Sequence, residues 1–322
     1  MHIAYLISAH TDAPQLRRLV DALQPDAHYF VHIDKKSDIS PFVALLNRQN
    51  VHFLDERIDV RWGTILEVDY QMLLIKAALD YPLHFDRLMT LSGLDYPLWN
   101  NTRISQYFQQ MERKEILSGF DLSTPGVPDE NTIIYRLPRP FFAIPFLSNQ
   151  RNQQLSILGR VIRTILGKPL PKKLGEKLKL RKPLILPNGW HLYKGAAWWA
   201  ISEELGRYVY ETYNARPELR QYFTDSFGQA ETVVQTIAFN HPEWKQKCIL
   251  FKHQYPGLVA LTPLHFIIYA GAIRIMSEID YQMLIDSDKM FTRKLMSGKS
   301  EQLIQMLETK RNEDENQQIK DY

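Results

Sequence analysis

Short apolar runs alternate with amphipathic helical patterns along the first hundred residues. The apolar runs predict strands at 3–8, 29–33, 51–54 and 88–91. Apolar residues three and four positions apart predict helices at 14–23, 42–46 and 66–79. Strands and helices in alternation are typical of a parallel α/β sheet, in which a ligand binds outside the carboxyl ends of the strands. The pattern therefore directs attention to the residues that follow each predicted strand.

The segment from 87 to 98 shows what such a strand end can carry. The predicted strand runs into a Ser92-Gly93 turn, which places Asp95 just beyond the carboxyl end. Pro97 then prevents the run from continuing as a central strand. A carboxylate at this place can hold a sugar hydroxyl, a ribose or a metal, but the same spacing is also ordinary turn chemistry. The residues alone leave both interpretations open.

The composition is that of a globular protein. Of 322 residues, 45% are hydrophobic and 23% are charged, and the net charge of +3 is too small to indicate nucleic-acid binding. A single cysteine, Cys248, excludes an internal disulfide framework and a cysteine-rich metal site. The amino terminus lacks a positively charged segment, and no apolar run approaches the ~18 residues of a membrane span. We expect a cytoplasmic protein, or one peripheral to the inner face of the cell membrane.

Several nucleotide-binding motifs are missing from the sequence. It contains no Gly-x-Gly-x-x-Gly, no Walker loop and no Asp-x-Asp. His32 and Asp34 lie two positions apart, on one face of a predicted strand, and could supply two metal ligands. Nothing else in the sequence supports a metal at this pair. The Trp62-Gly63 pair precedes a helix, where glycine lets the backbone approach a ligand under an aromatic cover, although the tryptophan could equally pack its own loop.

The segment 148–183 is strongly basic. It holds ten Lys or Arg residues against one acid, Glu176, and its first part has an apolar helical stripe. Such a segment fits an anionic membrane surface or a lipid-linked phosphate. A solvated loop is the competing interpretation, and nucleic acid is less favoured because no aromatic residues are interleaved for base stacking.

The second half of the chain offers aromatic and charged candidates. Trp190, Trp198 and Trp199 could present aromatic faces to sugar rings, although tryptophans also fill cores. Ser202 is expected to cap a helix whose first turn contains two acids. Glu231 lies at the start of an otherwise apolar helix, so it is either a general base or a first-turn helix acid.

Cationic side chains gather near the end of the chain. Adjacent Arg293 and Lys294 could clamp a diphosphate. Basic residues after a helix also complement its dipole, which is the structural alternative. The segment 308–322 is polar enough to be predicted as a disordered tail.

Taken together in this order, these motifs resemble the core-2/I-branching glycosyltransferase family, which includes β-1,6-N-acetylglucosaminyltransferases and peptide O-xylosyltransferases. The resemblance runs from about residue 2 to residue 307, and the motifs at 30–37 and 291–294 look closer to the xylosyltransferase branch and its bacterial relatives. The matching motifs are Phe30-Val-His-Ile-Asp34-Lys-Lys-Ser37, Trp62-Gly63, Leu91-Ser-Gly-Leu-Asp-Tyr-Pro-Leu98, Gly195-Ala-Ala-Trp-Trp-Ala-Ile-Ser202, Ala230-Glu231 and Phe291-Thr-Arg-Lys294.

The resemblance implies an α/β fold of the GT-A nucleotide-sugar type, with a mixed, mainly parallel central sheet flanked by helices. It implies one domain over 1–307 with a basic insertion at about 148–185. It also implies a UDP-sugar donor, inversion at the anomeric carbon, and a reaction without a metal or other cofactor. The missing membrane anchor and paired cysteines of the eukaryotic members point to a bacterial enzyme.

Site residues follow from the resemblance by position. Glu231 matches the catalytic base, and Arg293 and Lys294 match the diphosphate clamp, with Arg274 as a weaker match. The donor pocket is implied to be lined by Asp34, Trp62, Gly63 and Asp95.

The sequence thus predicts an inverting, metal-independent glycosyltransferase. It would move GlcNAc or xylose from a UDP-sugar to a hydroxyl of a glycan, free or lipid-linked, in bacterial cell-surface polysaccharide synthesis, with no nucleic-acid partner. Two alternatives remain: a non-catalytic carbohydrate- or membrane-binding protein that keeps the fold, and a metal-dependent transferase that uses His32 and Asp34.

Overall fold

The computed structural model describes residues 1–122, 185–186, 188–224, 226, 228–251, 256–269 and 273–320. Its main sheet has five strands in the order β3-β2-β1-β4-β8. The first four are parallel, and β8 runs antiparallel to β4 at one edge. The strands are β1 (Ile3–Ala9), β2 (His28–Ile33), β3 (Val51–Phe53), β4 (Arg87–Ser92) and β8 (Ala200–Ile201).

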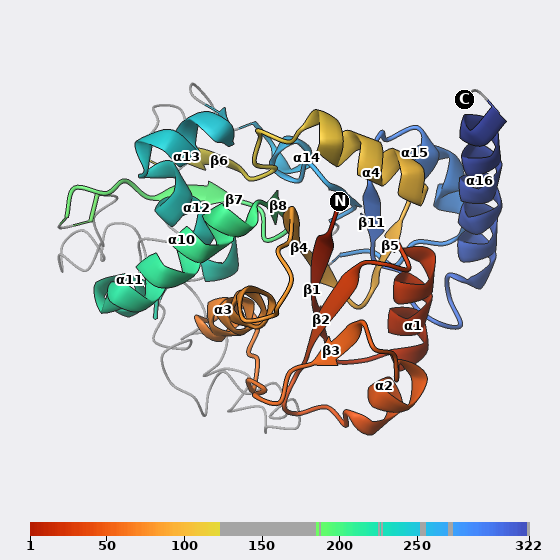
Figure 1. Cartoon of the computed structure of the whole chain (residues 1–322), viewed down its shortest axis with the longest axis horizontal. Coiled ribbons are helices and arrows are strands. Elements are labelled where there is room, and N and C mark those ends of the chain that lie inside the picture. The colour runs from red at the N-terminus through yellow and green to blue at the C-terminus, as the bar shows by residue number, and fades with distance from the viewer. Residues whose placement is uncertain are drawn as a thin grey trace, which may run out of the picture.

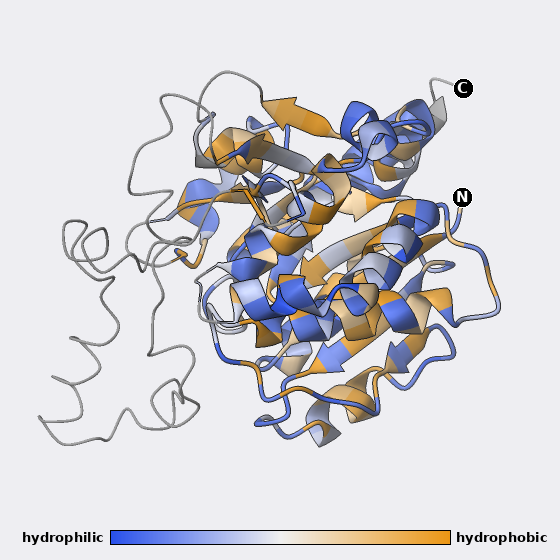
Figure 2. Cartoon of the chain, turned by 90° about the vertical axis from the view of Figure 1, so that its left-hand side faces the viewer, coloured by the Kyte–Doolittle hydropathy of each residue, from blue (hydrophilic) through white to orange (hydrophobic). Residues whose placement is uncertain are grey.

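Helices cover both faces of this sheet (Figure 1). They are α1 (Ala13–Ala22) and α2 (Ser40–Leu45) on one face, and α3 (Leu66–Leu79) and α10 (Glu203–Ala215) on the other. Alternation along β1 explains the two layers, because Tyr5 and Ile7 pack with the α1 side whereas Ala4 and Leu6 pack with the α3 side. In Figure 2 the helices alternate between hydrophilic and hydrophobic residues, as helices with one buried face do.

Two smaller sheets extend the main one. One has the order β10-β11-β5 and the other the order β7-β6-β9. Their strands are β5 (Asp95–Pro97), β10 (His265–Ile267) and β11 (Phe291–Arg293), and then β6 (Ser118–Asp121), β7 (Tyr193–Gly195) and β9 (Ile249–Phe251). Pro97 lies on an edge strand, where its missing N–H costs no ladder hydrogen bond.

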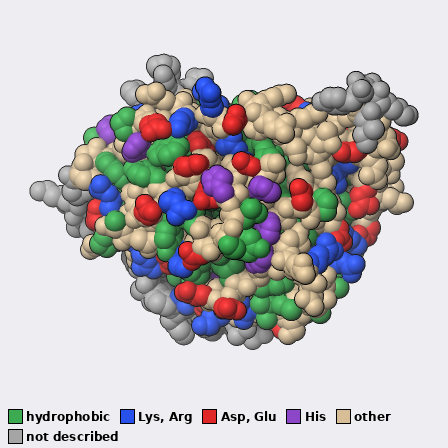
Figure 3. All heavy atoms as spheres, in the orientation of Figure 1, with side chains coloured by type: hydrophobic (Ala, Val, Ile, Leu, Met, Phe, Trp, Pro, Cys, Tyr) green, Lys and Arg blue, Asp and Glu red, His purple; other side chains and the backbone are tan. Residues whose placement is uncertain are grey.

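The remaining helices surround these sheets. They are α4 (Asn101–Gln110), α11 (Pro217–Phe223), η2 (Gln229–Glu231), α12 (Val233–Phe239), α13 (Pro242–Lys247), α14 (Leu258–Leu261), η3 (Glu278–Asp280), α15 (Tyr281–Ile285) and α16 (Glu301–Lys320), of which η2 and η3 are 3₁₀ helices. None of the described helices is long and apolar enough to cross a membrane. The face drawn in Figure 3 carries basic and acidic side chains that are interspersed.

The fold class predicted from the sequence is confirmed. The expected strands and helices of the first hundred residues are all present, and α3 has the predicted bounds of 66–79. Ser202 caps α10 as expected, because its side chain accepts a hydrogen bond from the Leu205 backbone N–H.

The prediction of a disordered tail at 308–322 is wrong for residues 308–320, which continue α16. Tertiary contacts hold this polar segment in place. Arg311 is buried and donates to the Trp99 carbonyl oxygen at 2.9 Å, and Glu308 accepts from the Tyr96 hydroxyl at 2.9 Å. Composition did not reveal these contacts, because each partner lies about two hundred residues earlier in the chain.

Candidate functional site

The strand order reverses at β1, because β2 and β3 lie on one side of it and β4 lies on the other. The crevice at such a reversal is where open α/β sheets bind ligands. His10 follows β1 there, and the Gly93 turn follows β4. The two strand ends approach so closely that a Cβ on Gly93 would lie 2.8 Å from the Cβ of Ala9. A glycine is needed at this turn for that reason.

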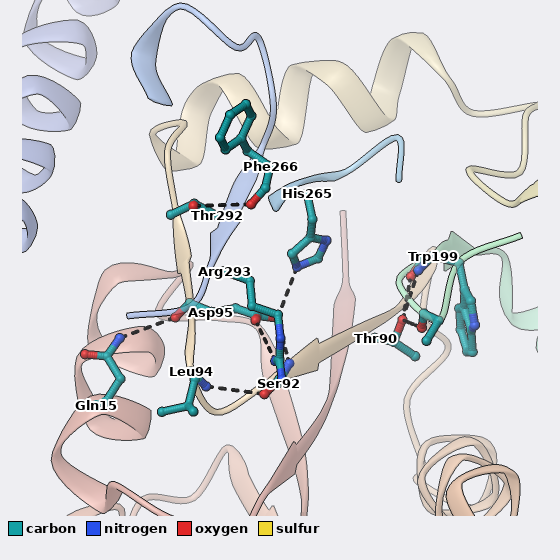
Figure 4. Close-up of polar contacts among 11 residues, drawn as sticks. Gln15, Thr90, Ser92, Leu94, Asp95, Trp199, His265, Phe266, Thr292 and Arg293 are labelled. Carbon is teal, nitrogen blue, oxygen red and sulfur yellow. Dashed lines mark hydrogen bonds and ion pairs between the residues drawn. The ribbon is translucent and has the colours of Figure 1, made fainter. Parts of the chain in front are cut away.

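Asp95 lies just past this turn, fully buried (Figure 4). One carboxylate oxygen accepts from the Ser92 backbone N–H at 2.7 Å and lies 3.1 Å from Nε2 of His265. The other oxygen accepts from the Arg293 guanidinium at 3.1 Å. Strand register brings the partners together, because Arg293 on β11 lies opposite Asp95 on β5.

Electrostatics favour the ionised form of Asp95. Burial acts to raise its pKa, but His265, Arg293 and the Ser92 N–H together lower the pKa below the ordinary value. Asp95 therefore closes the turn, as turn chemistry predicts, and it also fixes Arg293. The expectation that it lines a donor pocket needs correction: with no exposed surface, it can act on a ligand only through Arg293.

Arg293 is the exposed end of this cluster. Its side chain is 16% exposed, and its guanidinium carbon lies 5.4 Å from the ring centre of Trp198. The Trp198 ring in turn lies 5.3 Å from that of His265. In neighbouring Lys294, burial lowers the pKa of the ammonium group, with further lowering by Arg293 and Lys299. Arg293 and Lys294 are thus two adjacent cationic side chains at the edge of the cluster.

The two adjacent tryptophans have different positions. Trp198 is half-buried beside Arg293, whereas Trp199 is fully buried in the core between α3 and α10. The prediction that Trp199 contacts substrate is wrong, because neighbouring residues of an extended segment point to opposite sides. Trp190 is half-buried, and the Arg216 guanidinium lies 4.4 Å from the centre of its ring.

The Trp62-Gly63 turn leads into α3 and is tied to Glu67. The Gly63 N–H donates to the Glu67 carboxylate at 2.8 Å, Gly63 has a positive φ of 75°, and the Trp62 side chain is 62% exposed. The pKa of Glu67 is raised to about 7, mainly by burial and further by the negative charge of Glu231. The hydrogen bond from Gly63 and the positive charge of Arg293 act to lower this pKa. Glu67 therefore lies near enough to both Glu231 and Arg293 for their charges to act on it.

Glu231 occupies the position expected from the sequence. It ends η2, which follows Gly228 with its positive φ of 75° and precedes the fully buried helix α12. The Glu231 side chain is 39% exposed, and Lys194 Nζ lies 3.3 Å from one carboxylate oxygen. A partly exposed carboxylate at the edge of an apolar helix can take a proton from a bound hydroxyl.

Asp34 lies beyond β2 and is held by Lys36. The Asp34 carboxylate accepts from the Lys36 backbone N–H at 3.0 Å, and its other oxygen lies 3.0 Å from the Lys36 ammonium group. Burial lowers the pKa of the His10 imidazole, and the nearby positive charges of Lys294, Arg293 and Lys36 lower it further. The negative charge of Asp34 acts in the opposite direction. His10 therefore lies near enough to Asp34 and to the cationic pair for their charges to act on it.

The proposed metal pair has other partners. Nε2 of His32 accepts from the Ile58 backbone N–H at 2.9 Å, and its ring stacks on Tyr70 at 5.3 Å between ring centres. Burial lowers the pKa of His32 to about 4. In the part of the chain that the structure describes, no group of three or more His, Cys, Asp and Glu side chains could hold a metal ion.

A shallow cavity of about 760 Å³ lies beside the β2 and β3 ends. The loop that follows β3 forms most of its wall, and Lys35 completes it at the β2 end. Its lining residues are Lys35, Asp55, Glu56, Arg57, Ile58, Asp59, Arg61 and Leu66.

Arg274, one of the predicted site residues, does not belong to the cluster of Asp95, His265 and Arg293. Arg274 forms an ion pair with Asp280, whose side chain also accepts from the Ser277 N–H at the start of η3. The Arg274 charge therefore has a structural partner. The basic stretch 148–183 lies outside the described residues.

Sequence reasoning missed His10, Glu67, Lys194 and His265. His10 and Glu67 had local signals, since one directly follows a predicted strand and the other lies four residues after Gly63. Lys194 and His265 had none, because their partners Glu231 and Asp95 are distant in sequence: His265 meets Asp95 through the pairing of β10, β11 and β5, and Lys194 meets Glu231 because α12 packs against β7.

Sequence similarity to known proteins covers part of the chain. Residues 3–126 match the model of the Core-2/I-Branching enzyme family. A xylosyltransferase from Ciona intestinalis is 26% identical over 122 residues, which are 36% of this chain and 14% of that protein. The chain thus spans a small part of this curated relative's length.

Two solved structures align with most of the chain. Mouse xyloside xylosyltransferase 1 has a TM-score of 0.35 at 12% identity, with 91% of this chain and 97% of that chain covered. The 4-diphosphocytidyl-2C-methyl-D-erythritol synthase of Anaerococcus prevotii has a TM-score of 0.38 at 12% identity, with 88% and 95% covered. TM-scores this low establish no close structural relationship. The segment that matches the Core-2/I-Branching enzyme model, residues 3–126, includes Asp34, Glu67 and Asp95.

Proposed function

We propose that the protein is an inverting glycosyltransferase that uses a UDP-sugar donor. One observation carries the proposal: η2, which ends at Glu231, packs against α3, where Glu67 holds the Trp62-Gly63 turn. The charge of Arg293 also acts on Glu67, so a candidate base and a candidate diphosphate cation lie around one position within the segment that matches the core-2/I-branching family.

In the proposed reaction, Glu231 takes the proton from an acceptor hydroxyl while that oxygen attacks the anomeric carbon of the sugar. The bond from that carbon to the UDP oxygen breaks on the opposite face, and Arg293 and Lys294 stabilise the negative charge that develops on the diphosphate. Asp95 fixes the orientation of Arg293 through the 3.1 Å hydrogen bond. No covalent sugar–enzyme intermediate is needed, and no metal step enters the mechanism.

The finer assignments rest on the family resemblance. We propose GlcNAc or xylose as the donor sugar and a glycan hydroxyl, on a free or lipid-linked chain, as the acceptor. We also propose that the reaction belongs to bacterial polysaccharide synthesis at the cytoplasmic side of the membrane.

The test is UDP release from a panel of UDP-sugars, with and without glycan acceptors. We expect turnover with one UDP-sugar, and Glu231→Gln should lower the rate by about 10²–10⁴-fold while UDP binding is retained. Glu243→Gln is the matched control, because Glu243 is an exposed acid that is also paired with a lysine, Lys247 at 2.6 Å. No turnover across the panel, or full activity in Glu231→Gln, would contradict the proposal.

A second arm tests the cations. The double variant Arg293→Ala with Lys294→Ala should weaken UDP binding by at least about tenfold, because it removes both charges next to the diphosphate. Isothermal titration calorimetry measures this directly. Equal UDP affinity in the double variant and the wild type would remove the clamp from the mechanism.

A further inference from the structure

The Glu231 carboxylate has a built-in cationic partner. Lys194 Nζ lies 3.3 Å from a Glu231 oxygen, and the Lys194 side chain is only 14% exposed. Covering a charged group is costly unless an opposite charge pairs with it, and the close carboxylate supplies that pairing. The neighbour here is the residue to which the proposed function assigns proton transfer.

The strand that carries Lys194 is fixed on both sides. On one side, β7 pairs with β6, where Lys194 lies opposite Phe120. On the other side, helix α12 binds the strand through side chains: Thr236 Oγ1 accepts from the Tyr193 N–H at 3.1 Å, and Gln235 donates to the Ala196 carbonyl oxygen at 2.7 Å. These two bonds lie one residue before and two residues after Lys194.

The same helix fixes Glu231. η2 ends at Glu231, and α12 begins two residues later at Val233. α12 is therefore the common support of the carboxylate and of the lysine. The backbone positions of Glu231 and Lys194 are thus both set by contacts with α12.

Another carboxyl group also lies near the pair. Helix α3 packs against η2, and the charge of Glu231 adds to the raised pKa of Glu67 on α3, whereas the charge of Arg293 opposes it. The Lys194 ammonium group is in direct contact with the Glu231 carboxylate.

We propose that Lys194 is a positioning residue for the transfer reaction, which holds the Glu231 carboxylate ionised and oriented toward the acceptor. This inference rests on the proposed function, because it assigns a role relative to the base. Lys194 itself touches neither the donor nor the acceptor in this role. A purely structural ion pair would stabilise the fold without affecting how activity depends on pH.

The pH profile of kcat/KM separates the two roles. In Lys194→Met the acid limb should move to higher pH by about 0.5–1 unit, because loss of the adjacent positive charge favours the protonated carboxyl group. Activity at a pH well below the limb should then fall by about threefold to tenfold, with much of it recovered at alkaline pH. Lys194→Arg should restore the wild-type limb, because it returns the charge.

Lys245→Met is the matched control. Lys245 also contacts β7, since it donates to the Tyr193 hydroxyl at 2.9 Å, but its recorded partner is this hydroxyl rather than Glu231. Its acid limb should coincide with that of the wild type. Far-UV circular dichroism and the melting temperature establish that each variant is folded before the profiles are compared.

A double-mutant cycle provides the second readout. If Lys194 acts through Glu231, Lys194→Met should have little further effect on the residual rate of Glu231→Gln. An unmoved acid limb in Lys194→Met, or full additivity of the two substitutions, overturns the role of Lys194 while leaving the transferase function intact. Absence of any wild-type turnover overturns the proposed function and this inference with it. If Lys194→Met does not fold, Lys194→Gln takes its place in the same profile.

Discussion

Asp95 shows how one buried carboxylate can serve a turn and a site together. It accepts from the Ser92 N–H at the end of β4, contacts His265 and fixes Arg293. Each partner compensates for part of the cost of burying the charge, which would otherwise be severe. Arg293 is consequently held at the rim with less freedom than a surface arginine would have. Such pre-orientation favours the binding of an anion, because less side-chain entropy is lost.

Asp95→Asn should damage both stability and ligand binding. The amide cannot compensate the buried charges of its partners, so we expect the free energy of unfolding to fall by about 3–5 kcal/mol. UDP affinity should also fall, because Arg293 loses its anchor. Urea unfolding and calorimetry measure the two effects. Asp86→Asn, which changes an exposed acid that accepts from the His2 backbone N–H at 2.6 Å, should change neither by a comparable amount.

Glu67 gives the stability of the protein a specific pH dependence. Its pKa is raised from the model-compound value of 4.5 to about 7, mainly by burial. The folded state therefore holds this proton more tightly than the unfolded chain does. The resulting stabilisation is fully present below the unfolded value and is lost as the pH rises to about 7.

Glu67→Gln should remove this slope. The amide stays neutral, so the variant does not lose this stability as the pH rises. The difference in unfolding free energy, variant minus wild type, should therefore increase by on the order of 1–3 kcal/mol between pH 4.5 and pH 8. Denaturant titrations at both pH values measure the comparison. Parallel pH dependences in the two proteins would show that Glu67 does not titrate in this range.

At the scale of elements, the strand β7 depends on its tight approach to β6. A Cβ on Gly195 would lie 1.9 Å from the Ser118 carbonyl oxygen, which belongs to the neighbouring strand. Backbone atoms cannot move away without breaking the pairing. The glycine thus sets the distance between the strands, and with it the position of the adjacent Lys194.

Gly195→Ala should therefore destabilise the protein by about 2–4 kcal/mol, as substitutions that force the backbone apart do. Gly206→Ala offers a matched comparison, because its Cβ would meet the end of the Leu88 side chain at 2.4 Å instead of backbone. A side-chain end can shift, so the loss should be smaller. Chemical denaturation decides the order, and equal losses would contradict this account.

At the scale of the whole molecule, α16 joins distant parts of the chain. Its apolar residues Leu303, Ile304 and Leu307 pack with Tyr96 and Leu98. Figure 1 shows the helix at one side of the molecule, beyond α1, α4 and α15. Because it packs against β5, α16 supports the strand that carries Asp95.

Arg311→Met tests this connection. Arg311 is buried and donates to the carbonyl oxygens of Trp99 and Ala22, so its loss leaves both acceptors without that partner. We expect a loss of about 1–3 kcal/mol in the free energy of unfolding. Lys310→Met removes only an exposed pair with Asp314 and should change stability by less than about 0.5 kcal/mol. Equal effects would show that α16 does not depend on this docking.

The sequence by itself determined the elements with strong local patterns. Periodicity defined β1 to β4 and α1 to α3, because a buried strand and a half-buried helix each impose a repeat on their own residues. Turn and cap chemistry placed Asp95 after β4, Ser202 before α10 and Glu231 before α12 for the same local reason. The candidate residues of the site were therefore largely visible in the sequence.

Only the tertiary structure decided what those residues do together. Asp95 proved to be buried behind Arg293, Trp199 to be core, and Arg274 to be paired with Asp280. His265 became relevant through sheet pairing and Lys194 through the packing of α12 on β7, neither of which a local pattern encodes. The physical reason is that burial and charge pairing are set by neighbours far away in sequence, whereas strand, helix and turn propensities depend on residues only a few positions apart.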